Sequence, residues 1–427
     1  MSCVKSKKIK DGLYVHFIKA EKFKTNLISL YITVPYGKDN AEICSLLPKV
    51  LKRGCEKYPT INDMAKKRED LYGASFYSGL RKNGDGAGLY FSLEFVSDKF
   101  LSENTFSDAV DFLKNVVLHP NVKDGKFDEN CVETEKKNLK DYILGLVNDK
   151  KDYADQAVKE LAFPNDSYSI PNGGKAENVD KITTKELFDF YCNIVSNCRF
   201  DVFLSGSFNE DEAEKIITDE IFSDIDPRCE KEEKTVSTKD IKLVDVKRKT
   251  ETMEVSQSKL CMIMYTFSDG EDEKDACAFR VFNCIFGGSP FSKLFNNVRE
   301  KLSLAYYVSS RLDLKKGTML ISSGIEGDKF DAAYNEIMLW LEKMQDGEFS
   351  EEEIASAKKY LETGINSIGD SLRACEDYYA SKICCGKEVE DIEMLLNGIN
   401  SVAKEDIICA AKKVKLAAVY FLTGNKS

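Results

Sequence analysis

Three residues in the stretch 43–59 (ICSLLPKVLKRGCEKYP) have the spacing of a metal site but not its chemistry. Ser45, Pro48 and Lys49 stand at positions i, i+3 and i+4 of an expected amphipathic helix, which places them on one helix face. A metal enzyme would place its ligands with this spacing. A hydroxyl, an imide ring and an ammonium are poor ligands for zinc, which prefers imidazole, thiolate and carboxylate. We therefore expect no metal at this face.

Other combinations of residues that could carry out catalysis are also few in this sequence. The chain has two histidines, His16 and His119, and neither lies in a nucleophile motif. The 14 cysteines are scattered along the chain, and we expect them to be reduced core residues. An enzyme of another kind, working through Cys55 or a serine, remains an open alternative. No nucleophile is paired with a base at a recognisable spacing, which argues against it.

The overall charge and hydropathy narrow the class of protein. A net charge of -11 and a pI near 5.1 argue against a nucleic-acid binder, because a phosphate backbone requires a basic face. No apolar run approaches the ~18 residues that would span a bilayer. The N-terminal lysines are followed by no apolar segment typical of a secretory signal. We expect a cytoplasmic globular protein that does not bind membranes.

The order of predicted elements occurs twice along the chain. In the first half, β-rich runs and helical patterns alternate, with a hairpin turn predicted at residues 83–86. The second half repeats a strand, two helices, a strand pair and two long helices. Its expected helices include 289–301, with Ser289 as cap and Pro290 at the first position, and 350–368, with a capping box of Ser350 and Glu353.

The ends of the two halves match as well. Residues 179–206 and 399–424 both contain a helix followed by a short strand that ends in Ser-Gly or Thr-Gly. A repeat of roughly 220 residues indicates duplicated domains, because solenoid repeats are much shorter. The prediction is an α+β fold of two tandem homologous domains, each a mostly antiparallel sheet covered by helices. We place the first domain at 1–225, a polar linker at 226–250 and the second domain at 251–427.

Three segments resemble the insulinase/pitrilysin-type zinc peptidases, whose inverted metal motif is H-x-x-E-H. They are CIFGGSPFSKLFNNVREKLSLAYYVSS (284–310), SGIE (323–326) and YPTINDMAKKREDLYGASF (58–76). The resemblance covers essentially the whole chain. It is closest to the small two-domain bacterial branch, which is similar to the mitochondrial processing peptidase subunits. The stretches RGCEKYPT, DLYGASF and NDKKDYA are similar to its metal-less members.

The resemblance gives the opening stretch a position-by-position interpretation. If Gly54 matches the glycine that follows the motif, Ser45, Pro48 and Lys49 stand where histidine, glutamate and histidine would be. The glutamate that acts as general base on a zinc-bound water is then also missing. The distal glutamate ligand should fall within 127–148. Glu135 is close to it, but the preferred register selects Asp141 or Tyr142, so no residue is assigned.

The substrate-binding signature of the second domain is retained. The resemblance implies that Arg299 and Tyr306 bind the substrate backbone and help to stabilise the tetrahedral intermediate. A guanidinium and a phenol are suitable donors for a carbonyl oxygen that gains negative charge. Composition alone instead favours a solvated arginine beside Glu300 and an ordinary strand tyrosine.

Two functions follow from this resemblance. In the first, the chain has no cofactor and no activity alone, and is the non-catalytic subunit of a heterodimer. Its partner would carry zinc in H-x-x-E-H, and the pair would process unfolded peptides. In the second, it is a scaffold or peptide-binding protein, such as a homodimer without a zinc-bearing partner. Some metal-less relatives are associated with modification of elongation factor P, which fits either role.

Overall fold

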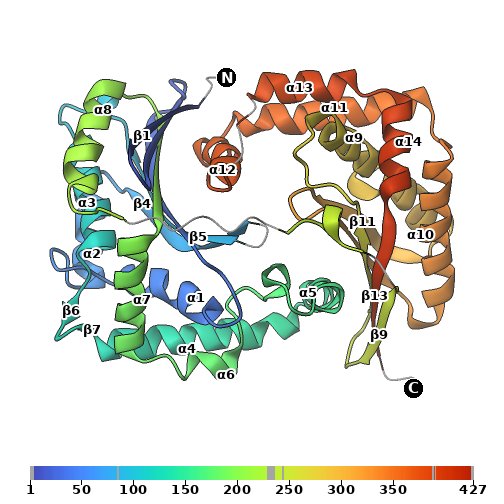
Figure 1. Ribbon diagram of the computed structural model, residues 1–427, viewed down its shortest axis with the longest axis horizontal. Helices are drawn as coiled ribbons and strands as arrows, with labels where there is room; N and C mark the ends of the chain where they lie inside the picture. The colour runs from blue at the N-terminus through green and yellow to red at the C-terminus, as the bar shows by residue number, and fades with distance from the viewer. Residues whose placement is uncertain are drawn as a thin grey trace. The chain divides into compact units, whose positions relative to one another are not determined.

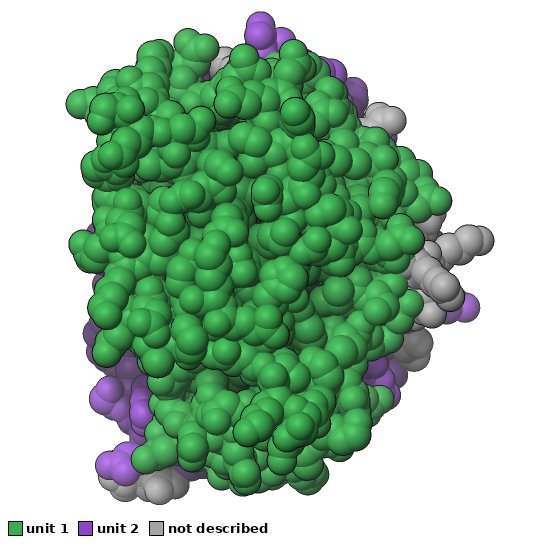
Figure 2. Space-filling view, turned by 90° about the vertical axis from the view of Figure 1, so that its left-hand side faces the viewer, with its two compact units in different colours: residues 1–144, 170–233, 367–391 green, residues 145–169, 234–366, 392–427 purple. Residues whose placement is uncertain are grey.

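The computed structural model describes residues 4–83, 86–227, 236–242, 245–386, 389 and 391–424. These residues form two compact units, which Figure 2 distinguishes by colour. The first unit comprises Met1–Leu144, Ile170–Glu233 and Ser367–Asp391, and the second comprises Gly145–Ser169, Lys234–Asn366 and Ile392–Ser427. Each unit therefore contains a segment from the other half of the sequence. The contiguous boundaries expected above stay a prediction.

The first unit is built on a six-stranded sheet in the order β1-β2-β8-β3-β5-β4. Only the β2–β8 pair is parallel, and the other neighbours are antiparallel. The strands are β1 (Lys5–Lys10), β2 (Leu13–Lys19), β3 (Thr25–Val34), β4 (Ser75–Asn83), β5 (Gly86–Val96) and β8 (Arg199–Gly206), and a separate hairpin consists of β6 (Val122–Lys123) and β7 (Lys126–Phe127).

Helices cover one face of this sheet because each presents an apolar stripe to it. Leu46, Leu47 and Val50 of one helix join Phe112 and Val116 of another in a single core with the sheet. The helices of the unit are α1 (Ala41–Leu51), α2 (Ile61–Asp70), α3 (Phe106–Leu118), α4 (Glu129–Gly145), α6 (Ala176–Val179), α7 (Thr184–Asn197), α8 (Glu210–Ile217) and α12 (Leu372–Ile383) (Figure 1).

The second unit repeats the topology of the first. Its sheet has the order β11-β12-β10-β13-β9, and only β13 and β9 are parallel. Its elements are α5 (Lys150–Ala162), β9 (Lys247–Thr252), β10 (Ser258–Tyr265), α9 (Glu273–Asn283), β11 (Ala305–Asp313), β12 (Thr318–Ile325), α10 (Phe330–Gln345), α11 (Glu351–Ile368), α13 (Ile392–Ser401), α14 (Lys404–Lys413) and β13 (Lys415–Thr423). The antiparallel α+β architecture and the duplication predicted from the sequence are therefore confirmed.

One helix in each unit comes from the other half of the sequence and covers the second face of the sheet (Figure 1). Helix α5 packs on β10 and β13 through Ala154, Val158 and Ala162. Helix α12 packs on β8 and β3. This covering explains why β10 is buried at every residue, whereas an open sheet face would alternate with polar residues.

Several local predictions are resolved. The capping box is confirmed, since Ser350 and Glu353 bond reciprocally to each other's backbone N–H groups. The helix expected over 289–301 is wrong at its start: its regular part, a π-helical turn η7, covers Phe295–Lys301. Ser292 rather than Ser289 caps it, with Oγ accepting from the N–H of Phe295. The turn at Gly84-Asp85 lies outside the described residues.

The charged edge strands were not anticipated. Strand β1 is lysine-rich, and β9 begins at Lys247 within the segment expected to be linker. Both strands present mostly exposed side chains, so neither has the apolar alternation by which a strand is predicted.

Candidate functional site

Helix α1 carries the three residues at the expected metal face. The helix begins at Ala41 and runs through Pro48 to Leu51, so Pro48 stands inside the helix rather than in its first turn, where a proline is best tolerated. Ser45 is buried, and its Oγ donates to the carbonyl of Ala41 at 2.9 Å within the same helix. The carbonyl of Pro48 accepts a hydrogen bond from Ser78 Oγ of strand β4 at 3.0 Å.

A partly buried ion pair lies beyond the end of α1. Arg53 Nε donates to Glu135 Oε1 of α4 at 2.6 Å, and the Glu135 side chain is 12% exposed. Asp141 and Tyr142, the positions that the register from the sequence preferred, are both exposed on this helix. Glu135 is the carboxylate that α4 turns toward the end of α1. Val132, Glu135 and Leu139 are buried at helical spacing on one face of α4. This periodicity could have identified Glu135 from the sequence.

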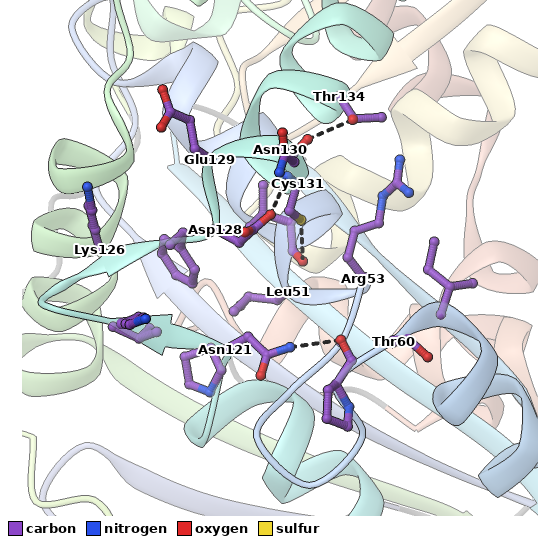
Figure 3. Close-up of a pocket in the computed structure, with 18 of the residues that line it drawn as sticks. Leu51, Arg53, Thr60, Asn121, Lys126, Asp128, Glu129, Asn130, Cys131 and Thr134 are labelled. Atoms are coloured by element: carbon purple, nitrogen blue, oxygen red, sulfur yellow. Dashed lines mark hydrogen bonds between the residues drawn. The ribbon is translucent and has the colours of Figure 1, made fainter.

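A cavity of about 780 Å³ lies next to this ion pair (Figure 3). It is lined by the end of α1, the loop to α2, the β6–β7 hairpin and the first turns of α4. Arg53, Lys126, Asp128 and Glu129 bring both charge signs to its wall. Two pairs of polar groups in its lining bond to each other: Asn121 donates to the Pro59 carbonyl, and Cys131 N–H donates to Asp128.

The thiols near this cavity are not activated nucleophiles. Burial raises the pKa of Cys131 to about 11. Cys55 is fully buried, and burial raises the pKa of its thiol as well. A nucleophilic cysteine requires the thiolate, which a lowered pKa would supply. The structure therefore gives no support to chemistry at Cys55.

Both histidines lie within hydrogen-bond distance of polar side chains on other parts of the first unit. His16 is buried in β2, where Nδ1 lies 2.8 Å from Ser6 Oγ and Nε2 lies 2.9 Å from Asp201 Oδ1. Arg199 donates to the same Asp201 oxygen at 2.8 Å, so this array ties edge strand β1 to the centre of the sheet. His119 Nε2 lies 2.9 Å from Asp224 Oδ2 at the surface.

The expected substrate-binding pair lies at the edge of the second sheet. Arg299 is in the last turn of η7, and its guanidinium carbon lies 4.6 Å from the centroid of the Phe295 ring. Tyr306 is 59% exposed near the start of edge strand β11, and its hydroxyl donates to Glu326 Oε1 at 3.2 Å. The pKa of Glu326 is lowered by hydrogen bonds from Lys329 and then Tyr306. The SGIE segment (323–326) is thus the end of the neighbouring strand β12, and its Glu326 orients the Tyr306 phenol.

The first unit has a matching turn without the tyrosine. Tyr72 and Ser303 both adopt positive φ, 57° and 48°, where a helix passes into an edge strand. Counted from these two residues, Arg68 corresponds to Arg299 and Ser75 corresponds to Tyr306. The duplicated fold therefore supplies the same backbone support twice, but only the second unit carries both donors.

The comparisons with known proteins decide the family. Residues 181–361 match the family described as "Peptidase M16 inactive domain". The chain is 32% identical over 433 residues to "Probable inactive metalloprotease YmfF" of Bacillus subtilis, covering 100% of this chain and 99% of that protein. The chain belongs to the insulinase/pitrilysin-type (M16) peptidase family.

Solved structures agree with this membership. A conserved protein from Enterococcus faecalis superposes with a TM-score of 0.92 at 30% identity, with 100% of both chains covered. The M16 peptidase inactive domain protein from Pseudomonas fluorescens superposes with a TM-score of 0.81 at 17% identity, covering 100% of this chain and 98% of that one. At that lower identity, the likeness shows the M16 fold alone.

The residues expected at the zinc position do not fit zinc. Ser45 Oγ is engaged with its own helix, Pro48 offers no side-chain donor atom, and Lys49 brings a positive charge. The Glu135 carboxylate is already neutralised by Arg53. Among the residues that the structure describes, no cluster of three or more His, Cys, Asp or Glu side chains could hold a metal. No described helix has the length and apolarity needed to span a bilayer.

Proposed function

We propose that this chain is the non-catalytic subunit of a heterodimeric M16 peptidase that processes unfolded peptides in the cytoplasm. The partner would carry zinc in H-x-x-E-H, and this chain would hold the peptide backbone through Arg299 and Tyr306. One observation carries the proposal: Arg299 and Tyr306 are exposed, while Ser45, Pro48 and Lys49, at the expected zinc position, offer no set of zinc ligands.

The position of the pair suits an extended peptide. Strand β11 is the last strand of its sheet, so one side of its backbone is free of a strand partner within the described part of the unit. An extended peptide can add to such an edge through main-chain hydrogen bonds. Tyr306 stands near the start of this edge and Arg299 stands near the end of the preceding helical turn. These positions support the proposal that both side chains bind a carbonyl oxygen of a peptide on β11.

Reconstitution with the H-x-x-E-H partner tests the proposal. A pull-down from the native cell should recover a protein that contains this motif. Arg299→Ala and Tyr306→Phe should each lower peptide turnover by the reconstituted pair about tenfold or more, as expected for loss of an oxyanion donor. Lys301→Ala and Tyr360→Phe, which change exposed residues of the same unit, are the matched controls. Full activity of both test variants would refute the assigned roles.

A second function is favoured by the hydrogen bond between Tyr306 and Glu326, which occupies the phenol without a substrate. In this function the chain is a scaffold or peptide-binding protein, with elongation factor P modification as one setting. A stable homodimer that engages no zinc-bearing relative, and binds unfolded peptides without cleavage, would support it. Cleavage that appears only with the H-x-x-E-H partner would exclude it.

A further inference from the structure

Helix α12 covers a face of the first sheet although its neighbours in sequence belong to the second unit. Cys375, Tyr379, Ala380 and Ile383 of this helix pack against Ile18, Tyr31 and Phe203 of the sheet. Two further contacts hold the side of the helix that faces β4. Arg81 Nη1 bonds Asp377 Oδ1 at 2.7 Å, and the Arg373 guanidinium lies 4.2 Å from the centroid of the Tyr77 ring.

An acidic side chain lies in the middle of this contact. Glu376 is 1% exposed, and hydroxyl groups of the sheet donate to it. Oε1 lies 3.4 Å from the hydroxyl of Tyr31, and Oε2 lies 3.4 Å from Oγ of Ser205. The hydroxyl of Ser29 on β3 also stabilises the ionised form. A carboxylate buried among neutral hydroxyl donors is still poorly stabilised, whereas a protonated carboxyl group fits the same surroundings.

The charged groups around Glu376 compensate only in part for the cost of burying its ionised form. Asp377 is adjacent in sequence and is paired with Arg81. Arg373 lies one helical turn earlier, and its buried Nη2 has no hydrogen-bond partner in the described structure. The titratable and charged groups on the packed elements include His16 on β2, Tyr31 on β3, Tyr77 and Arg81 on β4, Tyr90 on β5, Arg199 and Asp201 on β8, Arg373, Cys375, Asp377, Tyr378 and Tyr379 on α12, and Cys384 directly after it.

We propose that α12 is a protonation-controlled strap, which docks on the first sheet while Glu376 is protonated and is released as Glu376 ionises. This inference is independent of the role proposed for Arg299 and Tyr306. It rests on the position of the carboxyl group between the helix and the sheet. Since α12 carries the chain from one unit to the other and back, its release would expose the apolar sheet face around Tyr31 and Phe203.

The sign of the pH dependence follows from linkage. Burial, with Asp377 adding to it, raises the pKa of Glu376 to about 8, from an ordinary value near 4.5. The docked helix therefore holds the proton more tightly than the released helix. Docking is strongest below about pH 4.5, weakens by up to tenfold per pH unit as pH rises, and levels off above about pH 8.

Amide hydrogen exchange of the full chain tests the strap. After correction for the intrinsic base-catalysed rate, protection of residues 372–383 should fall roughly ten- to fiftyfold between pH 6 and pH 8. Helix α7 of the same unit is the internal reference and should change little. Glu376→Gln keeps the shape of the side chain without its titration, so its α12 protection should be independent of pH.

Thiol labelling provides a second measurement on the unaltered chain. Cys375 is buried where α12 packs on the sheet, and Cys198 is a buried thiol of the same unit outside this helix. The ratio of iodoacetamide labelling at Cys375 to that at Cys198 should rise between pH 6 and pH 8. A flat corrected protection together with a constant labelling ratio would overturn the proposal. So would a Glu376→Gln variant that loses as much α12 protection as the original chain.

Discussion

Arg53 donates a 2.6 Å hydrogen bond from Nε to Oε1 of Glu135, so an arginine of the same unit neutralises a buried carboxylate beyond the end of α1. In a zinc peptidase a metal cation supplies positive charge to the carboxylate ligands of this region. In this chain the positive charge comes from Arg53, whose side chain also lines the neighbouring cavity. The Glu135 carboxylate is therefore compensated by an ion pair within the unit.

The first prediction concerns the stability of this pair. Arg53→Met keeps an apolar stem but leaves Glu135 buried without its charged donor, which should cost about 1–3 kcal/mol of unfolding free energy. Urea unfolding measures the change. Adding Glu135→Gln removes the unpaired charge and should recover part of the loss. An Arg53→Met variant as stable as the original chain would mean that solvent satisfies Glu135.

The second prediction concerns metal. The chain as it stands should retain less than about one zinc per ten chains after dialysis, because the α1 face offers no suitable ligands. A variant with Ser45→His, Pro48→Glu, Lys49→His and Arg53→Met restores the motif and frees the carboxylate, so zinc content should rise toward one per chain. Mass-spectrometric metal analysis measures both.

Glu135→Gln in that variant is the matched control, and it should lower zinc retention at least tenfold if Glu135 is the distal ligand position. Equal zinc content with and without Glu135→Gln would contradict the position assigned to Glu135. Stoichiometric zinc in the unaltered chain would contradict the loss of the site itself.

The sequence predicted the fold well where side-chain patterns are local. The β-rich runs that predicted β3 and β5, and the reciprocal cap at Ser350 and Glu353, are found in the structure because neighbouring residues determine them. Strand β9 could not be predicted in this way. Its exposed KRKTET sequence forms a strand only because β13 supplies hydrogen-bond partners from the other end of the chain.

The candidate site shows the same limit. Arg299 and Tyr306 could be selected from a contiguous motif, whereas the partner of Tyr306 is Glu326, on a different strand end. Glu135 was named but not selected, because its contact is with Arg53, which is 82 positions away in the sequence. The exchange of α5 and α12 between the units is likewise a tertiary feature with no local signal.

The third prediction concerns Gly324 of the SGIE motif. A Cβ atom at this position would collide with Gln257 Oε1 and would lie 2.5 Å from Cε1 of Tyr307. Gly324→Ala should therefore displace the Tyr307 ring and destabilise the second unit by about 1–3 kcal/mol. Gly364→Ala is the control: a Cβ atom added there, in α11, would meet no atom within 4 Å, and the change should stabilise by up to about 1 kcal/mol. Thermal unfolding should show opposite signs, and equal effects would exclude steric crowding at Gly324.

The fourth prediction concerns the anchoring of α5 on the second sheet. Asp155 is buried on this helix, accepts a hydrogen bond from Ser322 Oγ of β12 and lies 3.3 Å from Cys261 Sγ of β10. Asp155→Ala removes the acceptor and leaves a buried hydroxyl unpaired, which should cost about 1–3 kcal/mol. Amide exchange of residues 150–162 should speed up accordingly.

Asp152→Ala, at an exposed position of the same helix, is the matched control and should change stability by less than about 0.5 kcal/mol. The contrast separates two ways of holding α5. If Asp155→Ala behaves like Asp152→Ala, the apolar contacts of Ala154 and Val158 suffice to hold the helix. If only Asp155→Ala loosens α5, the buried acid fixes the helix on its sheet, because the apolar contacts are the same in both variants.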